Sequence, residues 1–253
     1  MRVVALRPVL DLLFPALCPV CGARSDEPRR RPFCGACWAA LPLAPTPGCR
    51  TCGRTWPGLS PGLVCDGCRR HPPPFAYARA VGEFRDGMRA AILAMKYGRR
   101  PAVARPLGRL LAEAGGPLVA ATARGATAGA PGEGIDAIVP VPLHPARVTE
   151  RGFNQAELLA VPCATLWGVP LGTRALARVR PTRPQTELDA AARRANVAGA
   201  FEVTRPEDVT GRRLLLVDDV LTTGATVGAA ARALKAAGAE TVGVLVLARV
   251  PDG

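Results

Sequence analysis

The apolar and polar positions of the chain divide it into two unequal parts. From residue 75 onward, runs of branched apolar residues alternate with stretches whose apolar positions recur at helical spacing. The pattern predicts strands at 78–84, 135–143, 172–179, 201–203, 214–218 and 241–249, and helices at 88–96, 106–112, 154–167 and 225–237. Asp86 is placed to cap the first of these helices. This alternation predicts an α/β domain with a mostly parallel, twisted sheet and flanking helices.

The first 74 residues lack this alternation. Residues 1–17 are apolar but contain Arg2, Arg7 and Asp11, so we expect a short amphipathic helix rather than a signal peptide or a membrane span. The proline run 72–74 is typical of a stiff connector. We therefore expect a small module at 1–74 and a larger domain at 75–253, in which the Ala- and Gly-rich stretch 115–134 is partly helix and partly loop.

Eight of the nine cysteines form four Cys-x-x-Cys pairs in the small module. The second four follow the first four at a constant offset of 31 residues, which makes a tandem repeat of a four-cysteine unit. The two units are Cys18, Cys21, Cys34 and Cys37, then Cys49, Cys52, Cys65 and Cys68. A glycine follows the second cysteine of each unit, where it allows a tight knuckle turn.

This spacing indicates two structural Zn²⁺ sites, because two Cys-x-x-Cys turns together supply a tetrahedron of sulfurs. Disulfides are disfavoured in a chain expected in the cytosol, and a redox motif would need one pair at a strand–helix junction. Four cysteines per ion leave no open position for catalysis. Sequential pairing is the simplest arrangement, and interleaved pairing is the alternative. We expect Cys163, the ninth cysteine, to be a small buried core residue.

Charge narrows the range of partners. The chain has 33 Lys and Arg against 20 Asp and Glu, a formal net charge of +13. Such a balance favours anionic partners, either phosphates or nucleic acid, although a solvated basic surface would give the same count.

One segment combines several signals for a phosphorylated sugar. An apolar run at 214–216 leads into Asp218 and Asp219, and the turn Thr222, Thr223, Gly224, Ala225, Thr226 then opens a helix. The start of a helix presents unpaired N–H groups and a positive dipole end, which suit a phosphate. Adjacent carboxylates at the carboxyl end of a buried strand can hold ribose hydroxyls, Mg²⁺, or both.

A second segment makes the interpretation more specific. Residues 139–143 read Val-Pro-Val-Pro-Leu, and residues 150–155 read Glu-Arg-Gly-Phe-Asn-Gln. Segment 217–226 resembles the 5-phosphoribosyl-1-pyrophosphate (PRPP) motif of type I phosphoribosyltransferases. Together with the paired cysteines, the two segments resemble the ComF family, named for a role in bacterial DNA uptake. The resemblance covers nearly the whole chain and implies a type I phosphoribosyltransferase fold preceded by a tandem zinc-ribbon module.

The resemblance also implies roles for single residues. Thr222 to Thr226 would cradle the 5-phosphate, and Asp218 and Asp219 would hold the ribose hydroxyls and approach Mg²⁺. The turn at Val141 and Pro142 would bind pyrophosphate, with Arg147, Arg151 and Lys96 as charge partners. Arg147 and Lys96 could equally be surface cations. His144 is expected to be structural rather than a base. Residues 185–196 lie where this fold carries a flexible hood that closes over PRPP.

Three functions remain open at this point. The first is Mg²⁺-dependent transfer of the phosphoribosyl group to an unknown acceptor. The second is a cytosolic PRPP-sensing or nucleic-acid-associated protein that uses its zinc ribbons to dock single-stranded DNA or a helicase-like partner. The third is a purely structural zinc adaptor, which would leave the PRPP motif without a role.

Overall fold

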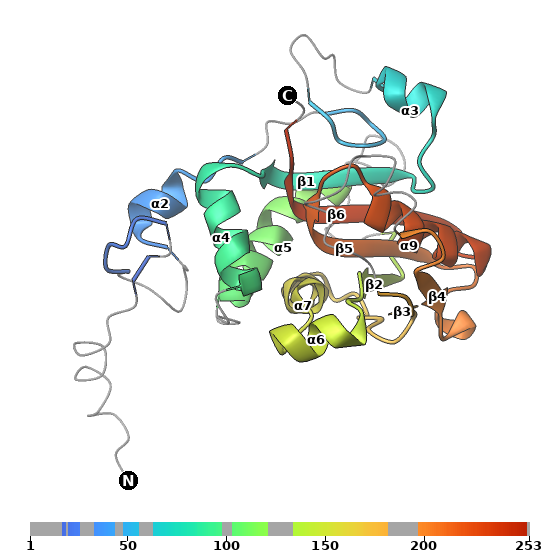
Figure 1. The fold of residues 1–253 in the computed structure, drawn as a ribbon. Helices are drawn as coiled ribbons and strands as arrows, with labels where there is room; N and C mark the ends of the chain where they lie inside the picture. The colour runs from blue at the N-terminus through green and yellow to red at the C-terminus, as the bar shows by residue number, and fades with distance from the viewer. Residues whose placement is uncertain are drawn as a thin grey trace.

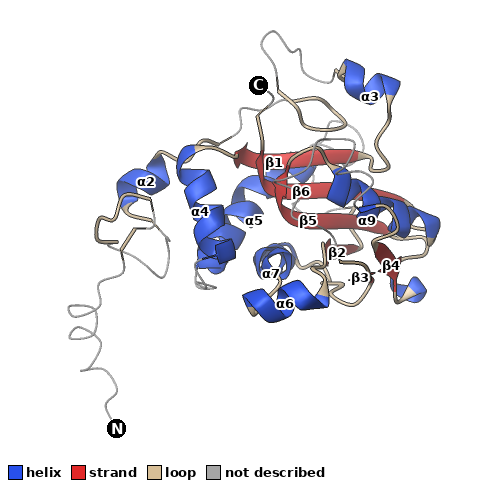
Figure 2. Ribbon diagram, viewed as in Figure 1, coloured by secondary structure: helices blue, strands red, loops and turns tan. Residues whose placement is uncertain are grey.

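The computed structural model describes residues 17–18, 20–25, 33–43, 48–55, 63–97, 103–120, 134–181 and 197–251. Its helices and strands are drawn in Figure 1 and coloured by type in Figure 2. Their bounds are α2 Gly35–Ala39, α3 Asp66–Arg70, β1 Tyr77–Glu83, α4 Asp86–Tyr97, α5 Ala104–Ala120, β2 Ala137–Pro140, α6 Pro145–Arg151, α7 Gln155–Trp167, β3 Leu176–Arg178, β4 Phe201–Val203, η3 Pro206–Asp208, β5 Arg213–Leu221, α9 Ala225–Ala236 and β6 Thr241–Arg249.

The centre of the fold is a parallel sheet. In the described part of the chain its strand order is β1-β6-β5-β2, and every neighbouring pair is parallel. Strands β3 and β4 form a separate antiparallel pair. The predicted parallel sheet with flanking helices is therefore confirmed.

Strict alternation of side chains places a core on each face of the sheet. Along β5, Leu214 and Leu216 pack into the core that contains α9. Leu215 and Val217 pack into the core that contains α4, α5 and α7. Figure 1 shows α9 on one face and the other three helices on the opposite face. The sheet is thus covered on both faces, as the continuous apolar runs predict.

Several predicted bounds were wrong, for local reasons. The predicted strand 135–143 is shorter, because Pro140 and Pro142 have no N–H to donate to a neighbouring strand. The predicted strand 172–179 is reduced to β3. Asp86 is the first residue of α4 and pairs with Arg85 (2.8 Å) rather than preceding the helix as a cap.

Helix α6 was not predicted, although its signals are present. Pro145 stands at its first turn, and Gly152 ends it in the left-handed conformation with φ 87°. Helix α5 is longer than predicted and includes residues 115–120. Residues 1–16 and 182–196, for which we predict an amphipathic helix and the flexible hood, lie outside the described residues.

The two four-cysteine units attach along the outer edge of β1, and we call them the first ribbon (residues 17–43) and the second ribbon (residues 48–71). At one end, Glu83 N–H donates to Pro42 O of the first ribbon (2.8 Å). Nearer the other end, Ala78 N–H donates to Thr51 O of the second ribbon (2.6 Å). Edge-strand groups that would otherwise be open to another chain are thereby occupied.

Candidate functional site

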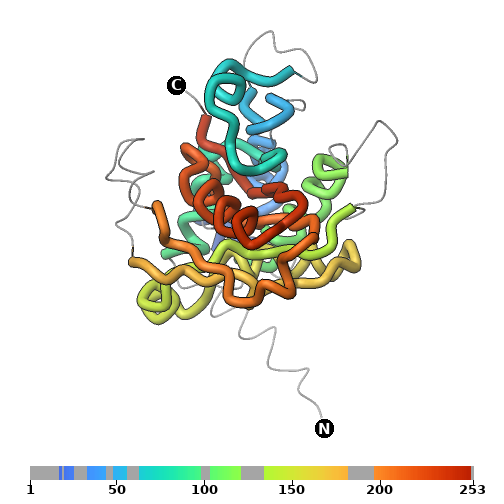
Figure 3. The backbone as a smooth tube through the Cα atoms, turned by 90° about the vertical axis from the view of Figure 1, so that its right-hand side faces the viewer, coloured from blue at the N-terminus to red at the C-terminus, as the bar shows by residue number. Residues whose placement is uncertain are grey.

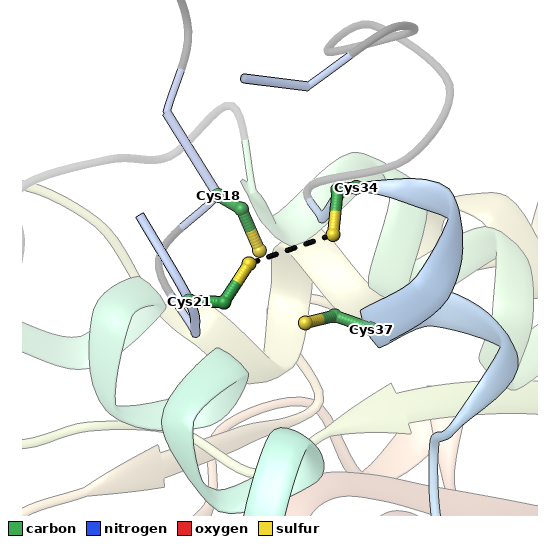
Figure 4. Close-up of side chains that lie close together, drawn as sticks. All are labelled: Cys18, Cys21, Cys34 and Cys37. Atoms are coloured by element: carbon green, nitrogen blue, oxygen red, sulfur yellow. Dashed lines mark hydrogen bonds between the residues drawn. The ribbon is translucent and has the colours of Figure 1, made fainter. Parts of the chain in front are cut away.

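The structure gathers the eight paired cysteines into two sequential groups. The candidate ligand sulfurs within each group all lie within 4.8 Å of one another. Figure 4 shows Cys18, Cys21, Cys34 and Cys37 pointing toward a common centre. The sulfurs of Cys21 and Cys34 are 3.6 Å apart, and those of Cys52 and Cys65 are 3.7 Å apart. A tetrahedral Zn²⁺ site requires a separation of about 3.8 Å, so both groups fit zinc with sequential pairing.

Backbone geometry supports a thiolate at Cys49 of the second group. Cys49 Sγ accepts N–H hydrogen bonds from Cys52 (3.5 Å) and Cys65 (3.3 Å). Burial alone would raise the pKa of Cys49, but these hydrogen bonds lower it to about 6. Burial raises the pKa of Cys52, and the nearby charge of Arg249 offsets part of that increase.

The first ribbon joins the core of the larger domain. Phe33 and Leu41 are buried in the same apolar cluster as Met88 and Ile92 of α4. A β-carbon added at Gly87 of α4 would lie 3.5 Å from the Leu41 side chain. Figure 1 shows α2 of this ribbon beside α4. Loss of this ribbon would therefore expose part of the main core.

The second ribbon attaches mainly through polar contacts. Arg79 Nη2 of β1 donates to Arg50 O (3.0 Å), and Arg249 Nη1 of β6 donates to Cys52 O (2.9 Å). Gly53 takes a left-handed conformation and lies so close to β1 that an added β-carbon would be 2.5 Å from Ala78 O. In the turned view of Figure 3, this ribbon lies above α9.

A cleft of about 600 Å³ opens at the carboxyl ends of β2 and β5. We call it the main cleft. Its walls come from α4, the turn after β2, helices α6 and α7, strand β3, and the end of β5 with the start of α9. Ligands of parallel α/β sheets bind at this edge. Residues of all four predicted groups therefore meet here: the acidic pair, the pyrophosphate turn, the cations and, through Thr222 and Thr226, the phosphate loop.

Asp218 and Asp219 both lie inside β5, which extends three residues beyond Asp218, the predicted end of the strand. Because neighbouring strand residues point to opposite faces, the two carboxylates have different environments. Asp219 faces α4, where Lys96 Nζ lies 2.8 Å from Oδ1. Its Oδ2 is buried and has no hydrogen-bond partner among the described residues.

Asp218 lies on the other face of β5 from Asp219. Burial raises the pKa of Asp218 to about 7; the Asp219 charge adds to the increase, while Lys96 and Arg178 oppose it. Asp218 Oδ1 also accepts the Asp219 N–H (2.8 Å). The pair can thus hold one or two negative charges near neutral pH, which suits a site that binds a cation or sugar hydroxyls.

The predicted phosphate loop, residues 222–226, connects β5 to α9. Gly224 precedes the helix in the left-handed conformation (φ 77°), which a glycine adopts without strain. Thr222 and Thr226 line the main cleft, whereas Thr223, Gly224 and Ala225 line a second cavity on the other side of the loop. The loop therefore forms a thin wall between two cavities.

The turn after β2 is fixed from both sides. Val141 N–H donates to Val217 O of β5 (2.9 Å). Asn154 Nδ2 donates to Val141 O (3.2 Å), and Asn154 Oδ1 accepts the Ala156 N–H as the cap of α7 (3.2 Å). Val141 and Pro142 both line the main cleft. Asn154 explains why the Glu-Arg-Gly-Phe-Asn-Gln segment accompanies this turn.

The three predicted cations all line the main cleft, but each has a partner. Arg147 is half-exposed on α6 and pairs with Glu150 (2.7 Å). Arg151 donates to Gln155 Oε1 (2.6 Å) and lies over the Tyr97 ring, 5.7 Å from its centroid. Lys96 pairs with Asp219, as described above. A polyanionic ligand would have to compete for these side chains.

Sequence reasoning missed Arg178, on β3. Its side chain lines the main cleft, stacks over Phe201 (5.4 Å) and lies near both Asp218 and Arg147. A signal was available, because Arg178 shares a strand face with the buried Leu176, and a cation on a buried face needs a reason. Gln155 and Tyr97 were also missed as lining residues.

Two expected structural residues have local roles. His144 Nδ1 accepts the Ala146 N–H (3.3 Å) and caps α6, although the residue also borders the main cleft. Cys163 is fully buried, and burial raises the pKa of its thiol to about 12, so it is an unreactive core residue. Within the described residues, no helix combines the length and hydrophobicity that a membrane crossing requires.

Comparison with known proteins matches both parts of the chain. The double zinc ribbon domain matches residues 9–70, and the phosphoribosyl transferase domain matches residues 154–253. The DNA utilization protein YhgH of Salmonella typhimurium is 36% identical over 201 residues, 79% of this chain and 83% of that protein. Competence protein F of Haemophilus influenzae is 38% identical over 115 residues, which are 45% of this chain and 50% of that protein. An orotate phosphoribosyltransferase of a Nocardioides species is 45% identical over 62 residues, 24% and 35% of the two chains.

Proposed function

The chain belongs to the ComF family, whose members join a double zinc ribbon to a phosphoribosyltransferase domain, and on this premise we propose that it binds PRPP with Mg²⁺ and transfers the phosphoribosyl group to an acceptor. One observation carries the proposal. The acidic pair, the helix-opening phosphate loop and the turn after β2 border a single cleft. Each matches a different part of PRPP: the ribose hydroxyls, the 5-phosphate and the pyrophosphate.

We assign the 5-phosphate to the phosphate loop. Thr222 and Thr226 contribute hydroxyls on the side of the main cleft, and α9 begins there with its positive dipole end. Twelve residues of α9 stand behind this terminus. Backbone N–H groups at such a position bind a phosphate without needing a cationic side chain.

We assign the ribose to Asp218 and Asp219. The buried Oδ2 of Asp219 has no partner among the described residues, and a ribose hydroxyl or a metal ion would supply one. Carboxylate oxygens are suitable ligands for Mg²⁺, and the ion when bound would neutralise pyrophosphate charge. Lys96 holds the Asp219 charge in the absence of ligand and would become available to an anion when a cation or hydroxyl replaces it.

We assign the pyrophosphate to the turn after β2 and the arginines around it. Arg147 and Arg151 of α6 and Arg178 of β3 approach the main cleft from two different elements. Guanidinium groups bind phosphate oxygens bidentately. These positive charges and the two carboxylates line the same cleft, so a ligand with a polar sugar centre and anionic ends is favoured.

In the proposed reaction, the bond between ribose C1 and the pyrophosphate oxygen breaks and a nucleophile of the acceptor bonds to C1. The leaving oxygen retains the bonding electrons, and the arginines stabilise its charge. The carboxylates hold the ribose in the orientation for attack. The chain supplies orientation and charge stabilisation, and this reaction does not require a dedicated base.

The relatives' names suggest a cellular setting. They describe DNA utilization and competence, and the +13 charge of this chain suits an anionic partner such as single-stranded DNA. We propose a related role here, with a protein of the DNA-uptake apparatus as a second partner. We also propose a cytoplasmic location, because the reduced thiols that the proposed zinc sites need persist there.

Pyrophosphate release tests the proposed transfer. The protein is incubated with PRPP, Mg²⁺ and a mixture of nitrogenous bases, and Asp218→Asn with Asp219→Asn serves as the control. Release that needs both an acceptor and the acidic pair would support transfer. Saturable PRPP binding without release would instead indicate a PRPP-sensing protein, and absence of binding would reject both roles.

A further inference from the structure

A second cavity, of about 370 Å³, lies behind the phosphate loop. We call it the rear cavity. Thr223, Gly224 and Ala225 line it on one side, and Cys52 and its neighbours in the second ribbon line it on the other. The loop that we assign to the 5-phosphate thus has the main cleft in front and a zinc-ribbon wall behind.

Arg249 connects the two walls of the rear cavity. It is the last residue of β6 and pairs in register with Leu221, the last residue of β5 before the loop. The next residue, Val250, donates its N–H to Leu221 O (2.9 Å). The Arg249 side chain then crosses to the second ribbon, where Nη1 donates to Cys52 O (2.9 Å).

The loop depends on such support because of its own composition. Gly224 occupies the left-handed conformation, and glycine moves among several backbone conformations at little cost. A change at Gly224 would redirect the N–H groups that open α9. A loop with a cavity behind it can move backward unless the far wall holds it, and close packing normally prevents this motion.

The proline connector adds to the same wall. Pro72, Pro73 and Pro74 line the rear cavity, and a β-carbon added at Gly228 of α9 would lie 3.8 Å from Pro74. The connector therefore lies against the first turn of α9. Both the ribbon and its exit segment contact the element that begins at the phosphate loop.

We propose that Arg249 is a positioning residue that ties the 5-phosphate loop to the second zinc ribbon, so that affinity for the sugar-phosphate end of PRPP depends on this ribbon. The inference rests on the proposed function. Metal-bound thiolates are anionic, and the metal supplies folding free energy to a ribbon of this size. A metal-loaded second ribbon therefore holds the Arg249 guanidinium more firmly than a metal-free one.

The test compares two arginines that both donate to carbonyls of the second ribbon. Arg249→Gln removes the hydrogen bond to Cys52 O, beside the phosphate loop. Arg79→Gln, on β1, removes the matched hydrogen bond to Arg50 O of the second ribbon. Binding of Mg²⁺-PRPP, ribose 5-phosphate and Mg²⁺-pyrophosphate is measured for each variant by calorimetry. Wild-type binding of PRPP tests the proposed function separately.

We expect Arg249→Gln to weaken the binding of PRPP and of ribose 5-phosphate about tenfold, because one charge-assisted contact is lost. The affinity for pyrophosphate, which we assign to the other end of the main cleft, should stay within about twofold of the wild-type value. The affinities of Arg79→Gln for all three ligands should also stay within about twofold. A merely structural defect would weaken pyrophosphate to the same extent. Equal losses for the three ligands, or unchanged ribose 5-phosphate binding with wild-type PRPP binding intact, would overturn the proposal.

A second pair of variants tests the metal. Cys52→Ser with Cys65→Ser should weaken the binding of ribose 5-phosphate about as much as Arg249→Gln does, because both changes break the connection between the phosphate loop and the second ribbon. Adding Arg249→Gln to the two serines should cause no further loss. Additive losses would show that Arg249 and the ribbon act independently and would contradict the proposal.

Discussion

The two zinc ribbons arise from one repeated cysteine pattern but attach to the larger domain in different ways. The first ribbon inserts Phe33 and Leu41 into the core beside α4. The second ribbon is held mainly by hydrogen bonds to β1 and by Arg249, and it closes a cavity behind the phosphate loop. The same metal-binding unit thus supports stability at one position and borders the ligand site at the other.

Apolar packing and polar contacts have different consequences when they are lost. Removing buried apolar groups costs free energy in proportion to the buried area and the cavity left behind. Removing a single polar contact at a partly exposed position costs less stability but can change the geometry of a neighbouring loop. The comparison therefore predicts stability defects for the first ribbon and ligand-binding defects for the second.

The largest effect should follow from loss of the first metal site. Cys34→Ser with Cys37→Ser should lower the free energy of unfolding by at least about 4 kcal/mol, since the metal provides much of a ribbon's folding free energy and the core beside α4 would open. Denaturant unfolding and zinc content per chain measure the effect. An unchanged unfolding midpoint in a variant that has lost one zinc would contradict a stabilising role for the first ribbon.

A single core residue should show the next largest effect. Phe33 is 1% exposed, and Phe33→Ala should cost about 3–5 kcal/mol. The contrasting change in the second ribbon is Leu63→Ala, at an apolar side chain that is 51% exposed, which should alter stability by no more than about 0.5 kcal/mol. Thermal unfolding of both variants measures the difference. Equal shifts of the melting temperature would contradict the predicted difference between the two ribbons.

The knuckle glycines provide a closer pair. Gly22 and Gly53 both have left-handed backbones, with φ of 72° and 71°. Alanine at either position should cost about 1–2 kcal/mol from the backbone alone. Only Gly53→Ala would also press a β-carbon against Ala78 O, so it should cost about 1–3 kcal/mol more. Equal losses at the two positions would mean that the second ribbon does not depend on close contact with β1.

The smallest predicted effect concerns pH and separates the main cleft from both ribbons. Because the pKa of Asp218 is raised to about 7, its carboxyl is protonated below that pH and ionised above it. Affinity for Mg²⁺-PRPP should therefore fall as pH drops below 7, by at most about tenfold per pH unit. The dependence should persist unchanged in Arg249→Gln and become weaker in Asp218→Asn, where only the titration of the ligand's phosphates is left, as binding measured between pH 6 and 8 would show.

The sequence predicts most of the fold because its signals are local. The alternation of β5 and β6, the helical periodicity of α4 and the cysteine spacing each specify an element without reference to the rest of the chain. Sequential grouping of the cysteines was the simplest arrangement, and the geometry agrees with it. Errors occur at proline-limited strand ends and at α6, whose seven residues carry no buried side chain to give a periodic signal.

The candidate site is less predictable because it depends on which elements meet. Lys96 was grouped with the pyrophosphate cations, but α4 brings it to Asp219. Arg178 enters the main cleft from a three-residue strand, and although the strand face that it shares with Leu176 marks it as unusual, the sequence does not say which cleft this strand borders. The double role of the phosphate loop, with a cavity on each side, requires the second ribbon to be in position. No pattern within residues 222–226 contains that information.

The most direct test of the account is a calorimetric titration of Mg²⁺-PRPP into the wild-type protein and into Asp218→Asn with Asp219→Asn. The account predicts saturable binding at one site per chain in the wild type. It also predicts at least about a hundredfold loss in the variant, since two contacts to the ribose and its cation are removed together. No measurable binding by the wild type, or equal affinity in the folded variant, would contradict the assignment of the main cleft to PRPP.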